Sequence, residues 1–113
     1  MEFLPEGLEE FILSQFQTVT QVEVLCYFYN HRGIAFSAST LCHQLFLSET
    51  MISQTLAKLI GLGYVAEVDT YFKYIDENPA ETKGFLKELV KLFETRKPLI
   101  VELLFNSFMK GEQ

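Results

Sequence analysis

The sequence predicts a mainly α-helical fold with one small β-hairpin. Apolar residues recur at helical spacing through most of the chain, beginning with Leu8, Phe11, Ile12 and Phe16. Two β-prone runs, 64–68 and 71–75, are separated only by Asp69-Thr70, which is the pattern of a hairpin. The chain has 113 residues, of which 49% are hydrophobic, and this length and composition favour one domain with one core.

Capping signals divide the first third of the chain into two helices. The first is expected over 7–17. The second begins after Thr18, because Thr18 with Gln21 three residues later forms a capping box. It continues to about His31 and ends at Gly33, since glycine adopts the left-handed conformation at little cost.

Two further helices are expected in the middle of the chain, after a small strand at 34–36. Ser37 is placed to cap a helix over 38–46, and Ser48 is placed to cap the next one after a tight break. This fourth helix ends at Gly63, and its inner face is expected to contain Ile52, Leu56, Leu59 and Ile60.

The hairpin and two terminal helices complete the chain. Asp69-Thr70 is not the favoured Asp-Gly pair, so the type of turn stays open. Asn78 as N-cap, with Pro79 at the first helical position, then predicts a helix that continues to about Arg96. Pro98 breaks it and opens a last helix over 99–109.

The order of these elements predicts a winged helix-turn-helix, mainly α with a small β-hairpin wing and flanking dimerisation helices. Two helices meet at a tight break, and a hairpin follows the second helix, which is the arrangement that places one helix in the major groove of DNA. We therefore expect a single domain over 1–113. It comprises an N-terminal helix (1–17), a winged-helix core (18–75) and C-terminal helices (78–110).

The segment 48–59, followed by Gly63-Tyr64-Val65, resembles the recognition helix and first wing strand of bacterial MarR-like regulators. The resemblance covers about residues 18–75, and its flanks are similar to small bacterial winged-helix proteins. It implies a homodimeric DNA-binding transcriptional regulator, with a recognition helix at about 49–62 in the major groove and a wing at 64–75. The DNA-binding residues it implies are Ser48, on a phosphate, and Glu49, Thr50, Ser53, Gln54, Lys58 and Lys73.

Charge argues against strong nonspecific DNA binding and keeps an alternative open. The net charge is −6, whereas phosphate contacts need Lys and Arg. The family often has Arg at the position of Gln54, and Glu49 and Asp69 would repel phosphate. The alternative function is a winged-helix adaptor that binds another protein and does not bind DNA. A third possibility is a ligand-responsive sensor, with a pocket between the aromatic terminal helices and the winged core.

The last helix is expected to contribute to a dimer. Its apolar arc is wider than one buried face requires, so part of it is expected to meet a second copy. The alternative is a helix that is buried within its own chain. The predicted interface residues are Phe11, Leu99, Ile100, Leu103, Leu104, Phe105 and Phe108.

Other classes of function have little support in the sequence. It has no phosphate loop, nucleophile elbow or paired carboxylates, so we expect no enzyme and no cofactor. Cys26, His31, Cys42 and His43 lack the spacing of metal ligands, and the two cysteines are expected to be reduced thiols in a cytoplasmic protein. The acidic start is not a secretory signal, and no membrane span or lipid partner is expected.

Overall fold

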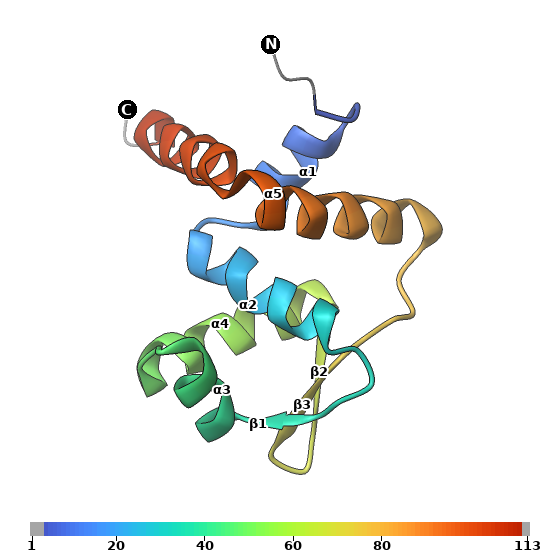
Figure 1. Cartoon of the computed structure of the whole chain (residues 1–113), viewed down its shortest axis with the longest axis vertical. Helices are drawn as coiled ribbons and strands as arrows, with labels where there is room; N and C mark the ends of the chain where they lie inside the picture. Colours follow the sequence, from blue (N-terminus) through green and yellow to red (C-terminus); the bar gives the residue numbers. More distant parts are fainter. Residues whose placement is uncertain (1–3, 112–113) are drawn as a thin grey trace. The chain divides into compact units, whose positions relative to one another are not determined.

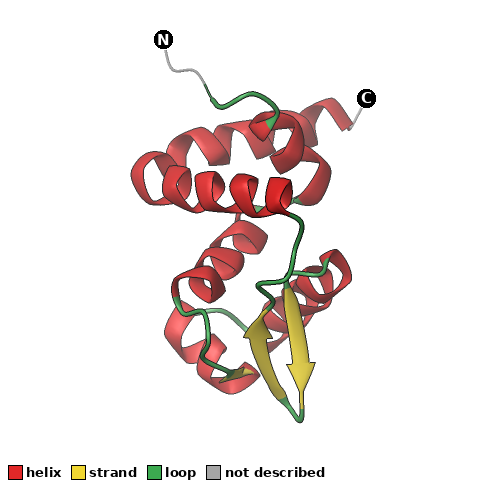
Figure 2. Cartoon of the chain, turned by 90° about the vertical axis from the view of Figure 1, so that its right-hand side faces the viewer, coloured by secondary structure: helices red, strands yellow, loops and turns green. Residues whose placement is uncertain are grey.

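A computed structural model describes residues 4–111 and the side chains of residues 4–109. The chain is mainly helical with a small three-stranded antiparallel sheet (Figures 1 and 2). The folded chain divides into two compact units. We call residues 23–78 the central unit, and residues 1–22 with 79–113 the terminal unit.

The central unit contains most of α2 (Val19–Asn30), followed by β1 (Phe36–Ser37), α3 (Ala38–Leu45) and α4 (Glu49–Leu62). The hairpin of β2 (Val65–Val68) and β3 (Tyr71–Tyr74) completes it. Figure 1 shows α3 and α4 joined by a short turn, with the hairpin following α4.

The sheet has the order β1-β3-β2 and is antiparallel throughout. Phe36 pairs with Phe72, and Val65 pairs with Tyr74 at the base of the hairpin. The strand expected at 34–36 is therefore displaced to Phe36–Ser37, because only these residues pair with β3. Ile34 lies outside the strand and is exposed.

Local capping explains where these helices begin and end. The Thr18 hydroxyl accepts a bond from the amide of Gln21 at 3.2 Å, as the capping box predicts. The Gln21 side chain bonds the amide of Gln17 rather than that of Thr18, at 2.8 Å. Gly33 and Gly63 both have positive φ, and Gly63 ends α4 as expected.

The core of the central unit comes from the inner faces of its helices and from the sheet. Ile52 and Leu59 of α4 are fully buried, and Thr55 on the same face is 5% exposed. Ile60 was expected on this inner face, but it lies at the margin of the helix stripe and is 38% exposed. The other large buried residues of this unit are Val24, Leu25, Phe28, Leu41, Leu56, Tyr64, Val65 and Tyr74.

The terminal unit pairs α1 (Leu8–Gln15) with α5 (Ala80–Gly111). Phe11 and Phe85 stack with ring centroids 5.0 Å apart. Gly7 caps α1 at φ 85°, and a Cβ there would lie 3.1 Å from the Phe85 ring. Both the backbone conformation and the close approach therefore favour glycine at this position.

The two C-terminal helices are one element with a kink. The backbone leaves the helical region at Arg96 (φ −143°, ψ 49°), two residues before the break expected at Pro98. Pro98 lies in the first turn of the second segment, where proline is tolerated, and its ring excludes a straight helix through the preceding turn. The start of α5 also differs from the expected one at Pro79. The helix begins at Ala80, and the Pro79 carbonyl accepts a hydrogen bond from a backbone amide of the helix at 2.9 Å.

No helix of the described part of the chain has the length and apolar character needed to cross a membrane.

Candidate nucleic-acid interface

The two helices on either side of the turn, α3 and α4, each begin at a serine N-cap. The Ser37 hydroxyl accepts a bond from the amide of Thr40, at 3.1 Å. The Ser48 hydroxyl accepts one from the amide of Met51, also at 3.1 Å. Ser48 is exposed, so its hydroxyl is both a cap and a surface group at the N-terminal end of α4.

The exposed face of α4 carries short, uncharged polar side chains. Thr50, Ser53 and Gln54 are exposed, and the small Ala57 continues the same face one turn later. Lys58 is half-buried at one margin of this face. The structure thus brings five of the predicted DNA-binding residues, Glu49, Thr50, Ser53, Gln54 and Lys58, onto one helix, with Ser48 as its cap.

Glu49 lies to one side of this face. With Ser53, it lines a shallow hollow that it shares with Ala38, Ser39 and Cys42 of α3. Glu49 also lies in the first turn of α4, where the helix dipole favours a negative charge.

The hairpin supplies one predicted basic residue and an apolar tip. Lys73 is exposed on β3, opposite Ala66. Val68 and Tyr71 pair across the turn and are 63% and 51% exposed. Asp69 and Thr70 both have positive φ, which is the geometry of a type I′ turn and settles the turn left open by the sequence.

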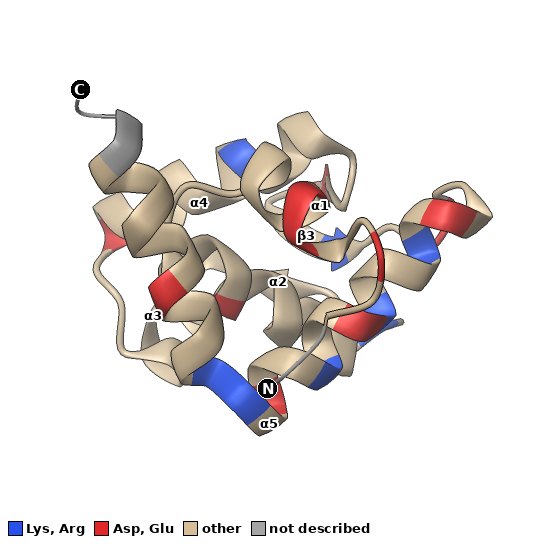
Figure 3. Cartoon of the chain, turned by 90° about the horizontal axis from the view of Figure 1, so that it is seen from above, with Lys and Arg blue, Asp and Glu red and all other residues tan. Residues whose placement is uncertain are grey.

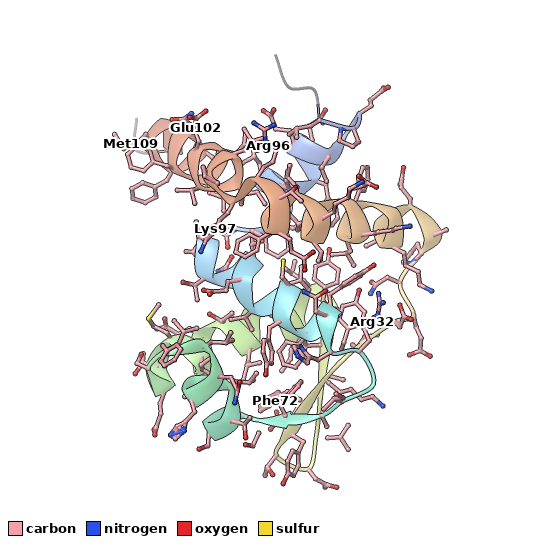
Figure 4. All side chains as sticks on the ribbon, in the orientation of Figure 1. Arg32, Phe72, Arg96, Lys97, Glu102 and Met109 are labelled. Atoms are coloured by element: carbon pink, nitrogen blue, oxygen red, sulfur yellow. The ribbon has the colours of Figure 1, made fainter. Side chains whose placement is uncertain are left out.

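Arg32 is a third cation of the central unit, and sequence patterns did not assign it to the site. It lies in the loop after α2 (Figure 4), with its guanidinium 4.1 Å from the centre of the Tyr29 ring. Tyr29 in turn meets Tyr74 edge to face at 5.6 Å. Burial raises the pKa of Tyr74 to about 12, and Asp76 adds to this shift, so the phenol is neutral at physiological pH.

Arg32 and Lys73 line one open hollow, together with Asp76 and Glu77. Over residues 23–78 the acids are Glu23, Glu49, Glu67, Asp69, Asp76 and Glu77, against the bases Arg32, Lys58 and Lys73. The central unit therefore has few groups for phosphate contacts. Outside it, Figure 3 marks the acidic positions of α1 and both the basic and the acidic positions of α5 along the ribbon.

The predicted dimer residues separate into buried and accessible sets. Ile100 is fully buried and Leu104 is 4% exposed, so both are covered within the chain itself. Phe11 is half-buried against Phe85, and Leu99 and Leu103 are half-buried. Phe105 and Phe108, each 60% exposed, remain accessible.

Two apolar neighbours extend the accessible pair, although sequence reasoning did not select them. Val101 is 40% exposed, and Met109, which lies near the C-terminal end of α5 (Figure 4), is 49% exposed. Val101, Phe105, Phe108 and Met109 follow the spacing of one helix face, and we call them the α5 stripe. The spacing alone could have identified this face, because Ile100 and Leu104 occupy the neighbouring one.

Cysteines and metal-ligand groups do not gather into a site in the described part of the chain. Cys26 is buried and Cys42 is half-buried, and neither of these two described residues is in a disulfide. No group of three His, Cys, Asp or Glu side chains among the described residues could hold a metal ion.

Comparison with known proteins gives no functional information, so a function must be proposed from the geometry of the structure. No family model, curated protein or solved structure matches the chain.

Proposed function

We propose that the central unit is a winged helix-turn-helix and that the protein is a homodimeric DNA-binding regulator. The order α2-β1-α3-α4-β2-β3 and the sheet order β1-β3-β2 support the winged-helix assignment. In this proposal α4 enters the major groove, α3 braces it, and the β2–β3 hairpin is the wing beside the DNA backbone.

The uncharged exposed face of α4 is the observation that carries the proposal. Hydroxyl and amide side chains form hydrogen bonds with base edges, and Gln pairs with adenine through two of them. Thr50, Ser53 and Gln54 offer these groups over the first two turns of α4, which is where recognition helices contact bases. The small Ala57 leaves room for close approach to the groove.

The small number of cations predicts that contacts with phosphate contribute little to DNA affinity. The central unit offers only Arg32, Lys58 and Lys73 as cations, and each phosphate contact adds about 0.9 to the slope of log affinity against log salt. Affinity for the correct sequence must then come largely from contacts with the bases. A regulator of this kind binds random DNA weakly and loses that binding as salt rises.

A fluorescence-anisotropy titration with random-sequence duplex DNA at ~50 and ~200 mM salt tests the proposal. We expect binding that weakens with salt, and we expect Lys58→Gln and Lys73→Gln each to reduce the salt slope by about 1. Lys87→Gln on α5 is the matched control, because it removes an equal charge outside the central unit. Absence of binding at the lower salt concentration would overturn the proposal.

A protein-binding adaptor is the second candidate, and one observation favours it. Phe46, Val68 and Tyr71 are exposed by 91%, 63% and 51%, and exposed aromatic and aliphatic side chains are typical of protein interfaces. The same titration separates the two candidates, because an adaptor has no salt-dependent affinity for DNA.

The homodimer is proposed from the α5 stripe. Its four apolar side chains are 40–60% exposed, and a second copy that packs through the same stripe would remove them from water.

A further inference from the structure

Phe46 has an unusual conformation at the turn between α3 and α4. It caps the C-terminus of α3 with φ 56° and ψ 46°, in the left-handed region. Bulky residues rarely adopt this region, and glycine or asparagine usually occupies it at helix ends. The side chain is 91% exposed, which is the largest exposed fraction among the large hydrophobic residues of the described chain.

Folding gives no reason for a phenylalanine at this position. The backbone strain disfavours it, and an exposed ring gains almost nothing from burial. No ring contact joins Phe46 to another described side chain, although several other aromatic residues of the central unit pack in pairs. Strained residues of this kind cluster at active sites, ligand clamps and switch regions.

Phe46 is close in sequence to the start of α4, the helix that the proposed function places on DNA. Phe46 is two residues before Ser48, the N-cap of α4. Met51, in the first turn of α4, is also apolar and 41% exposed. Phe46 and Met51 therefore flank the Ser48 cap in sequence, and both are exposed.

We propose that Phe46 makes an apolar contact with the C5-methyl group of a thymine in the major groove. This inference rests on the proposed function, because it requires α4 to lie in that groove. The thymine methyl is the one apolar group on the major-groove edges, and phenylalanine is among the side chains that contact it. A central unit with only three cations needs such contacts to supply affinity and sequence preference.

The test uses duplex DNA selected on the wild-type chain from a random pool. The selected pool is copied once with thymine and once with uracil, which lacks only the C5-methyl group. We expect the wild-type chain to bind the thymine copy about fourfold more tightly, as burial of one methyl group predicts. Phe46→Asn should bind both copies alike, at the affinity of the wild-type chain for uracil, with an unchanged salt slope because no charge is lost.

Stability distinguishes a contact residue from a structural one. Asn tolerates the left-handed conformation, so the midpoint of thermal unfolding of Phe46→Asn should equal or exceed that of the wild-type chain. Ile34→Asn is the matched control, because Ile34 is an exposed apolar residue of the same unit, outside α3 and α4. It should retain the preference for the thymine copy.

Each other outcome has a distinct meaning. If the wild-type chain selects no DNA, the proposed function fails, and this inference fails with it. If the wild-type chain binds both copies equally, or if Phe46→Asn keeps the thymine preference, the inference is overturned while the proposed function stands. A fall in the unfolding midpoint of Phe46→Asn would also overturn it, since Phe46 would then be needed for folding.

Discussion

At the scale of single residues, the Ser48 hydroxyl fixes where α4 begins. It accepts the amide of Met51 at 3.1 Å, and loss of such a cap costs about 1 kcal/mol. We therefore expect Ser48→Ala to lower the free energy of unfolding by about that amount, measured by urea denaturation. Ser53→Ala is the control, because Ser53 is exposed in the helix interior, where alanine is tolerated well. Equal effects of the two variants would contradict a capping role.

Caps of this kind are predictable from sequence because they depend on neighbours within three residues. Ser37, Ser48 and Thr18 all accept the backbone amide expected of them. Asn78 differs, since its side-chain amide donates to the carbonyls of Gly63 and Ile75 at 3.3 and 3.4 Å. Gly63 is fifteen residues away in sequence. The capping pattern covers only neighbouring residues, so it could not predict this hydrogen-bond partner.

At the scale of elements, the hairpin holds strain in its turn. Thr70 has φ 72°, and a β-branched residue in this region is a clear outlier. We expect Thr70→Gly to raise the free energy of unfolding by about 1 kcal/mol, because glycine adopts this conformation without the Cβ clash. Thr70→Ala is the control, because it removes the hydroxyl and keeps the Cβ. A similar gain in both variants, measured by thermal and urea unfolding, would show that backbone strain is not the cause.

The sequence predicted the existence of each element better than its ends. The hairpin was expected because its two β-prone runs are adjacent, and β2 and β3 form it. Phe46 was expected inside α3, yet the helix ends at Leu45. Periodicity continues through Phe46, and only the need to reverse the chain before Ser48 forces this residue into the left-handed region.

At the scale of the whole molecule, burial depends on contacts that periodicity does not specify. The last helix was expected to have a wide apolar arc. In the structure, part of this arc is buried and part is exposed. Ile100 and Leu104 are buried within the chain, whereas Phe105 and Phe108 stay exposed. The sequence predicted an excess of apolar surface correctly, but it could not assign each residue to the core or to a partner.

The α5 stripe leads to a prediction about assembly. We expect the wild-type chain to be a dimer in sedimentation equilibrium at micromolar concentrations, because pairing would bury apolar side chains that are now 40–60% exposed. Phe105→Ser combined with Phe108→Ser should give a folded monomer, since neither residue belongs to the buried core. Retained helical circular dichroism would confirm that the fold is intact.

The matched control for this experiment lies in the hairpin. Val68→Ser combined with Tyr71→Ser removes an apolar pair of similar exposure, 63% and 51%, from a different element. This variant should remain a dimer. If it dissociates while the α5 variant does not, the second copy packs on the hairpin, and the wing would then be covered in the dimer. A wild-type chain that sediments as a monomer would exclude both arrangements and leave α4 to recognise a single half-site.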